Sequence, residues 1–146
     1  MPAPFRLWPV EGSVMSAGWD LLVVDDEPVV RDAVRLVLAG EGFTVAAAAS
    51  GGEALAHEAL ADCRLVLCDL MLPDISGIDL VRSLRRGRPD LPVILITGYP
   101  TSENALAAIE AGASDFLPKP FTESELLAVV RRILKEETSP PRRRQP

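Results

Sequence analysis

The sequence predicts an α/β protein of the (βα)5 type, a doubly wound five-stranded parallel sheet with helices on both faces. Five short apolar runs recur along the chain, and each is followed by a stretch of helical periodicity. Four of the runs end on a charged or hydroxyl side chain. Strands that alternate with helices in this way form parallel sheets through right-handed crossovers. We expect the flavodoxin-like strand order 2-1-3-4-5.

Helix start and stop signals flank the segments between the strands. Pro28 suits the first turn of a helix, and Gly112 suits the end of one. Capping-box patterns, a hydroxyl residue followed three positions later by glutamate, open the second and fifth helical segments. The predicted strands cover residues 21–24, 43–47, 65–68, 92–96 and 115–118, and the predicted helices cover about 28–38, 50–60, 78–84, 101–112 and 122–134.

Domain organisation follows from length and from the composition of the two ends. The chain has 146 residues, 48% of them hydrophobic, which suits one globular domain with a substantial core. Residues 1–18 contain three prolines and two glycines and are interpreted as a flexible extension. Residues 138–146 contain three prolines and an arginine run, and we expect a flexible tail there. Residues 19–137 are the predicted domain.

Charge and cysteine usage exclude several classes of protein. A net charge of −6 argues against a nucleic-acid surface, and Arg82, Arg85, Arg86 and Arg88 are interpreted as a solvated face. The two cysteines lack zinc-type spacing and suit a reducing compartment. The apolar runs are too short to span a membrane. We expect a cytoplasmic protein that binds neither nucleic acid nor membrane.

Acidic residues follow two of the predicted strands. Asp25 and Asp26 come directly after the first strand, and Asp69 comes after the third. Because ligands of parallel sheets bind at the carboxyl ends of the strands, these carboxylates meet at one edge. Like charges about 4 Å apart repel by roughly 4 kcal/mol at an effective dielectric near 20. An all-oxygen site of this kind favours Mg²⁺, with Mn²⁺ as a second choice, over zinc.

Two further strand ends suit a phosphoryl group at the same edge. Thr97 follows the fourth strand and offers a hydroxyl, while Lys119 follows the fifth and offers an ammonium. Together with a metal they would neutralise a phosphoryl group in transfer. Asp69 is the best nucleophile, since its strand lies at the predicted centre of the sheet. Taken singly, each residue has a structural explanation as a cap, turn or loop charge; their convergence favours the site.

Four sequence motifs around these residues resemble the receiver domain of bacterial two-component response regulators. The resemblance covers residues 19 to about 137, with the motifs in the same order along the chain. The motifs are Val23-Val24-Asp25-Asp26-Glu27-Pro28, Leu67-Cys68-Asp69-Leu70-Met71-Leu72-Pro73-Asp74-Ile75-Ser76-Gly77, Ile96-Thr97-Gly98 and Asp115-Phe116-Leu117-Pro118-Lys119-Pro120-Phe121.

The resemblance implies a role for each site residue. Asp69 would accept a phosphoryl group from a phosphohistidine of a sensor histidine kinase or a phosphotransfer protein. Asp26, Asp69 and the Met71 carbonyl would bind Mg²⁺ directly, and Asp25 would act mostly through water. The switch residues would be Thr97 and Phe116, Lys119 would pair with the phosphate, and Pro120 would follow a cis peptide bond.

Several functional alternatives remain open from the sequence. An aspartate-nucleophile phosphohydrolase would combine similar residues, although it needs a second acid where Met71 stands. A receiver-like scaffold that is never phosphorylated is the other alternative. Under the favoured interpretation the only chemistry is self-phosphorylation and self-dephosphorylation, and the partner is either a downstream protein target or a lost output domain. A phosphorylation-dependent homodimer is also compatible with the resemblance.

Overall fold

The computed structural model describes residues 18–138, so the extension and tail predicted at the two ends lie outside it except for Gly18 and Thr138. The described part confirms the (βα)5 fold. Its elements are β1 (Leu21–Val24), α1 (Pro28–Gly40), β2 (Val45–Ala48), α2 (Gly51–Leu55), the 3₁₀ turn η1 (Glu58–Ala61), β3 (Leu65–Asp69), α3 (Gly77–Gly87), β4 (Val93–Thr97), α4 (Ser102–Ala111), β5 (Asp115–Pro118) and α5 (Glu123–Thr138).

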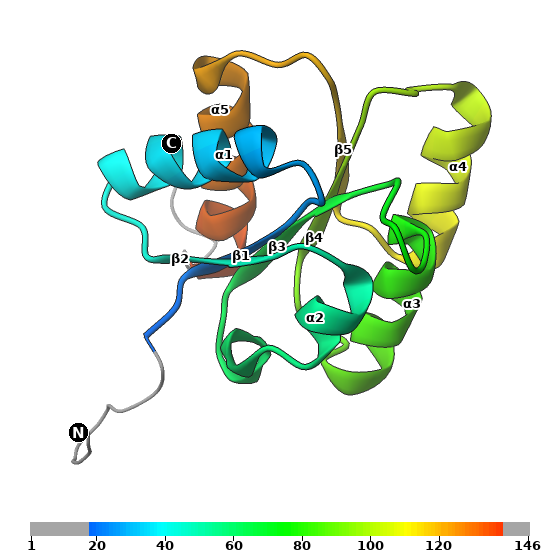
Figure 1. Ribbon diagram of the computed structural model, residues 1–146, viewed down its shortest axis with the longest axis horizontal. Helices are drawn as coiled ribbons and strands as arrows, with labels where there is room; N and C mark the ends of the chain where they lie inside the picture. Colours follow the sequence, from blue (N-terminus) through cyan, green and yellow to red (C-terminus); the bar gives the residue numbers. More distant parts are fainter. Residues whose placement is uncertain (1–17, 139–146) are drawn as a thin grey trace, which may run out of the picture.

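The five parallel strands form one sheet in the order β2-β1-β3-β4-β5, as predicted. Helices α1 and α5 cover one face, and α2, α3 and α4 cover the other (Figure 1). Alternate residues of β1 therefore enter different cores: Leu22 and Val24 pack on the α2–α4 side, and Leu21 and Val23 on the α1–α5 side. None of the helices between residues 18 and 138 has the length and apolarity needed to cross a membrane.

The central strand β3 is buried along its whole length between β1 and β4. Burial on both faces explains its continuous apolar run, which ends at the buried Asp69. Capping groups fix the helices around it as the sequence predicts. Thr101 caps α4, and Thr122 and Glu125 form the reciprocal capping box of α5.

The prediction for the second helix is wrong in its length. Helix α2 stops at Leu55, and the chain continues as the short turn η1. The cause lies at His57, which has an extended backbone and whose Nδ1 accepts the Ala59 N–H at 3.0 Å. A side chain that caps a new turn competes with continuation of the helix before it. The His57 ring also lies edge-on to Trp19, with 6.4 Å between ring centroids.

The interpretation of the α3 arginines as a solvated face is only half right. Arg82 and Arg86 are exposed, whereas Arg85 and Arg88 fold back over the protein. Arg88 donates to the Cys63 carbonyl at 2.6 Å, and Arg85 donates to carbonyls on either side of β4. Long side chains can bury their stems and ends in this way when carbonyls are left unpaired nearby.

Candidate functional site

Strand register delivers four of the predicted residues to one edge of the sheet. Val24 pairs with Cys68, so the next residues, Asp25 and Asp69, emerge side by side. Asp69 pairs with Ile96, which places Thr97 one step further on the neighbouring strand. Thr97 pairs with Pro118, the residue before Lys119. The site therefore follows from the parallel register of β1, β3, β4 and β5.

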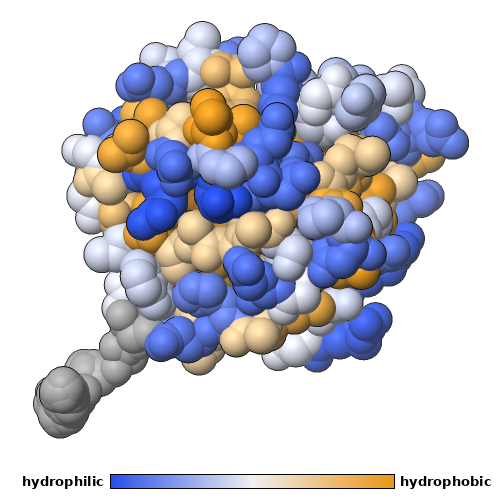
Figure 2. All heavy atoms as spheres, viewed as in Figure 1, coloured by the Kyte–Doolittle hydropathy of each residue, from blue (hydrophilic) through white to orange (hydrophobic). Residues whose placement is uncertain are grey.

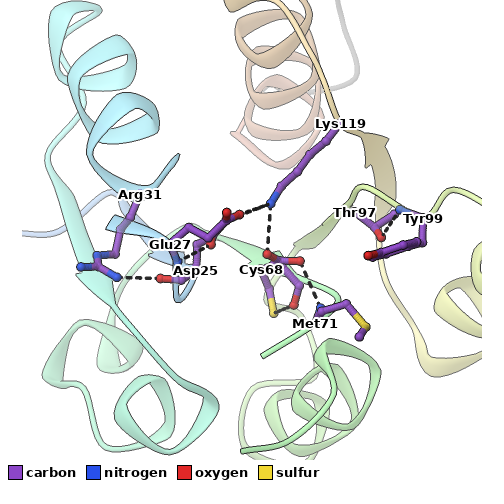
Figure 3. Close-up of polar contacts among 9 residues, drawn as sticks. Asp25, Glu27, Arg31, Cys68, Met71, Thr97, Tyr99 and Lys119 are labelled. Carbon is purple, nitrogen blue, oxygen red and sulfur yellow. Dashed lines mark hydrogen bonds and ion pairs between the residues drawn. The ribbon is translucent and has the colours of Figure 1, made fainter. Parts of the chain in front are cut away.

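Lys119 is the centre of the charged contacts at this edge (Figure 3). Its Nζ lies 3.1 Å from Asp69 Oδ2, 3.4 Å from Asp25 Oδ2 and 3.4 Å from Glu27 Oε1. The Asp25 and Asp69 side chains are almost fully buried, while Glu27 is exposed. Three carboxylates around one ammonium leave a formal excess of negative charge that favours a further cation.

Asp25 is held by backbone and side-chain hydrogen bonds of the β1–α1 loop. Its Oδ1 accepts the Glu27 N–H at 2.9 Å, and its carbonyl accepts from Arg31 at 2.8 Å. Burial raises the pKa of the Asp25 carboxyl above its ordinary value; the Glu27 hydrogen bond opposes this shift and the charge of Asp69 adds to it. The loop therefore presents a desolvated carboxyl to the site.

The ammonium of Lys119 responds to the same environment in the opposite sense. Burial by itself lowers the pKa of Lys119, but the hydrogen bond to Asp69 and the charges of Asp25 and Asp69 outweigh it. The pKa of Lys119 is consequently raised. A lysine in these surroundings stays positively charged and serves as the internal counter-ion of the carboxylates.

The structure groups Asp25, Glu27 and Asp69 rather than the acidic pair and Asp69. Each of the three offers an oxygen within 4.8 Å of the others, whereas Asp26 is exposed and outside this group. Opposite oxygens on one Mg²⁺ are about 4.2 Å apart, so a small approach of these carboxylates would suit the ion. Sequence reasoning missed Glu27, although its position directly after the acidic pair was a signal.

Thr97 and Phe116 lie on neighbouring strands. The Thr97 side chain is fully buried; its Oγ1 accepts the Tyr99 N–H at 2.9 Å, and its carbonyl accepts the Lys119 N–H at 2.7 Å. Leu95 and Phe116 are register partners, so Phe116 lies two residues further than Thr97 from the carboxyl edge of the sheet. It is partly buried against the α2–α4 core. Their roles as switch residues stay predictions.

The loop after Asp69 folds tightly against the end of β3. The Met71 N–H donates to Asp69 Oδ1 at 3.1 Å, and the Gly77 N–H donates to the Leu70 carbonyl at 2.7 Å. A Cβ at Gly77 would lie only 2.5 Å from the Asp69 carbonyl oxygen, so only glycine fits there. On the other side of the site, the Lys119–Pro120 peptide bond is cis, as expected. Metal binding by the Met71 carbonyl remains a prediction.

Comparison with known proteins gives the same result as the geometry. The family model described as "Response regulator receiver domain" matches residues 21–131. The probable transcriptional regulatory protein TcrX of Mycobacterium tuberculosis is 38% identical over 115 residues, which are 79% of this chain and 49% of TcrX. The alkaline phosphatase synthesis transcriptional regulatory protein SphR of Synechococcus elongatus is 40% identical over 130 residues, 83% of this chain and 51% of SphR.

A solved structure agrees with these sequence relatives. The CheY-like receiver domain protein of Methanospirillum hungatei superposes with a TM-score of 0.76 at 34% identity, covering 80% of this chain and 94% of that one. The present chain spans about half the length of the curated relatives it matches. The profile match, the relatives and the fold all identify one signalling module. The chain belongs to the receiver domain family of two-component response regulators, whose standard function is to accept a phosphoryl group.

Proposed function

We propose that Asp69 is the phosphoacceptor of this receiver domain and that a kinase phosphohistidine is the donor. The observation that carries the proposal is the position of Asp69 Oδ2, 3.1 Å from Lys119 Nζ at the end of the central strand. Asp69 Oδ1 is engaged by the Met71 N–H, which fixes the plane of the carboxylate. A carboxylate held in this way is oriented for attack on an incoming group.

The proposed transfer exchanges a phosphorus–nitrogen bond for a phosphorus–oxygen bond. An Asp69 oxygen attacks phosphorus, the bond to the donor imidazole breaks, and its electron pair returns to the ring nitrogen, which takes up a proton. Lys119 balances the charge of the phosphoryl oxygens, and the Thr97 hydroxyl donates to one of them once its side chain turns toward the site. Hydrolysis is the proposed second half of this chemistry: water attacks phosphorus, the bond to the Asp69 oxygen breaks, and the free carboxylate and inorganic phosphate are released.

Mg²⁺ is the proposed cofactor, with Mn²⁺ as an acceptable substitute. When bound, the ion would supply positive charge to the phosphoryl oxygens. The structure favours Asp25, Glu27 and Asp69 as its carboxylates, and the family resemblance favours Asp26 and Asp69.

Asp26→Asn and Glu27→Gln form a matched pair for this question. Magnesium titrations followed by amide NMR shifts measure binding without phosphorylation. A several-fold loss of affinity in Glu27→Gln alone would support the carboxylates grouped by the structure. The same loss in Asp26→Asn alone would show that the loop rearranges when the ion binds.

A groove beside the site suits docking of the kinase. It has a volume of about 570 Å³ and is lined by apolar residues of α1, by Lys119 and by the start of α5. Val29 lies on its rim and is 81% exposed. Figure 2 shows apolar side chains interspersed with hydrophilic ones over this part of the molecule, at the upper left of the view. Since Lys119 belongs to both groove and site, a helix bound here would bring its histidine close to Asp69.

The alternative functions are less well supported by the site. A phosphohydrolase needs an acid two residues beyond the nucleophile, and that position is the exposed Met71. A scaffold without phosphorylation has no need of the three carboxylates and the lysine that meet here. We propose that phosphorylation acts on a protein target or on an attached output domain, with homodimer formation as one form of readout.

Acetyl phosphate provides the direct test of the acceptor. With Mg²⁺, the full chain should gain one acid-stable, base-labile phosphoryl group, and Asp69→Asn should gain none by intact-mass measurement. Asp79→Asn is the matched control, because Asp79 is an exposed carboxylate on α3 whose ion pair, within residues 18–138, is with Arg82. Equal labelling of the wild type and Asp69→Asn would place the acceptor elsewhere.

A further inference from the structure

Helix α4 is held at its ends rather than along its length. Among its ten residues, all of which the structure describes, Ala108 is the only buried one. Leu106 and Ile109 are 58% and 67% exposed. With so little apolar burial, the position of the helix depends on the polar contacts at its two termini.

The amino-terminal contacts link α4 to Thr97. The Asn104 side chain donates from Nδ2 to the Tyr99 carbonyl at 2.8 Å, and the Tyr99 N–H donates to Thr97 Oγ1 at 2.9 Å. The Asn104 N–H also donates to the Thr101 hydroxyl that caps the helix. Asn104, in the first turn of α4, is therefore joined through Tyr99 to the Thr97 side chain, which is predicted to move.

The carboxyl-terminal contacts are of a different kind. Arg85 of α3 donates from Nε and Nη2 to the Gly112 carbonyl, at 3.0 and 2.6 Å. Its Nη1 donates to the carbonyls of Pro89 and Leu91. Gly112 itself has φ = 102°, a left-handed conformation that glycine adopts without strain. The guanidinium thus joins the end of α4 to α3 and to the segment before β4.

We propose that Asn104 and Arg85 are positioning residues that make α4 a lever, coupled at its first turn to the Thr97 loop and pivoting at Gly112. The proposal rests on the proposed function, because phosphorylation is what would move Thr97. Charge-assisted, two-pronged hydrogen bonds are roughly twice as strong as a neutral one. When Thr97 turns, the Asn104 end is released or carried along, and the Arg85 end stays in place.

Hydrogen exchange in the resting protein tests the Asn104 end. Asn104→Asp keeps the shape of the side chain and the backbone cap but loses the Nδ2 donor. The amides of Thr101 and of the substituted position should exchange several-fold faster, and those of Gly112 and Ala113 should not change. A negative charge in the first turn favours a helix, so a merely structural role predicts equal or slower exchange in this variant.

Glu103→Gln is the matched control for this end, since it changes the neighbouring exposed residue without touching Tyr99. Loss of this first-turn negative charge should raise its exchange rates only slightly, well below the several-fold change expected of Asn104→Asp. Amides of β3 serve as the internal reference for folding in every variant. Unchanged exchange at the first turn of α4 in Asn104→Asp would overturn the coupling.

Arg85→Lys tests the other end, with Arg86→Lys as control. Lysine keeps the charge but cannot span Gly112 and the carbonyls before β4 with one planar group. Exchange at Gly112 and Ala113 should rise several-fold in Arg85→Lys only.

With Mg²⁺ and beryllofluoride, amide shift changes in the wild type should decline along α4 toward Gly112. In Arg85→Lys they should extend past it, and an identical profile in both proteins would refute the pivot.

Acetyl phosphate labelling separates this proposal from the proposed function. Labelling of Asp69 in all four variants, with the exchange effects absent, would refute the lever and leave the phosphoacceptor intact. Absence of labelling in the wild type would refute the phosphoacceptor. The resting-state exchange results would still decide whether Asn104 and Arg85 hold the two ends.

Discussion

Helices α4 and α5 both pack beside β5, but different interactions hold them. Helix α5 inserts a continuous apolar stripe into the core formed with α1 and the sheet, made of Leu126, Val129, Val130, Ile133 and Leu134. Helix α4 buries one alanine and shows two large aliphatic side chains to solvent. Burial of each large aliphatic side chain stabilises by about 1.5–3 kcal/mol, so α5 is fixed by many contacts that α4 lacks.

Under the proposed function, this difference separates stability from switching within one small domain. An element that must change position cannot be held by interdigitated core side chains, since packed interiors resist small displacements. Polar contacts at the ends of α4 can be exchanged one at a time as the adjoining loop moves. The sheet therefore carries a rigid layer on the α1–α5 face and a helix of low local stability at the edge of the other face (Figure 1).

Truncation of one leucine in α5 and one in α4 should give the largest contrast in the free energy of unfolding. Leu126→Ala removes a side chain that is 1% exposed and should lower the free energy of unfolding by about 2–5 kcal/mol. Leu106→Ala, on the exposed side of α4, should change it by no more than about 0.5 kcal/mol. Urea denaturation followed by circular dichroism measures both. Equal losses would mean that α4 is packed as firmly as α5.

Removal of the Thr97 hydroxyl, the proposed switch group, should weaken the response of α4 to beryllofluoride more than that of α5. Thr97→Ala loses the acceptor of the Tyr99 N–H and the hydroxyl proposed to reach the phosphoryl group. With acetyl phosphate it should still be labelled on Asp69. Its beryllofluoride-induced amide shifts on α4 should be several-fold smaller than in the wild type, and α5 should differ little between the two proteins. Undiminished shifts on α4 would contradict the role of Thr97.

The smallest expected effect is on the pH dependence of stability, and it arises from the carboxylate that caps the start of α2. The Asp74 carboxylate accepts the N–H groups of Gly52 and Gly51 at the start of α2, and these hydrogen bonds hold its pKa below the ordinary 3.8. Because the unfolded chain takes up this proton more readily, the contribution of Asp74 to stability is present above pH 3.8 and is lost as the pH falls through the folded pKa.

Asp74→Asn should therefore show a weaker fall in stability across this acidic range than the wild type, measured by urea denaturation. Helix α4 is capped by the Thr101 hydroxyl, which does not titrate in this range, so hydrogen exchange at its first turn should not follow Asp74 protonation. A matching pH dependence in the wild type and in Asp74→Asn would show that other carboxylates account for the acid sensitivity.

Most of the fold could be predicted from the sequence because the apolar runs, the helical periodicity and the capping residues all indicated the same elements. Predicted strand bounds differ from the observed ones by at most two residues, and the capping boxes mark real helix starts. The second helix is predicted too long because apolar spacing continues through Ala59, while the break depends on a side-chain cap made by His57. Periodicity carries no information about such local competition.

The site could be predicted as far as strand ends determine it. Asp25, Asp69 and Lys119 meet because parallel register brings them together. The positions of the Asp26 and Glu27 side chains depend on the turn after β1. This turn directs Asp26 outward and Glu27 toward Lys119. Arg85 and Asn104 escape sequence-based prediction for a similar reason: their partners are backbone carbonyls, which have no signature in the sequence.

The strand order has a consequence for how the chain is made. Strand β1 pairs with β2 and β3, but β3 is completed only when β4 arrives from beyond α3. Until the ribosome has released β4, the nascent three-stranded sheet has β3 as its open edge, the strand buried along its whole length in the finished domain. Unpaired apolar edges recruit other chains. A nascent chain that pauses within α3 should thus depend most on chaperone protection, and polypeptides ending there should aggregate.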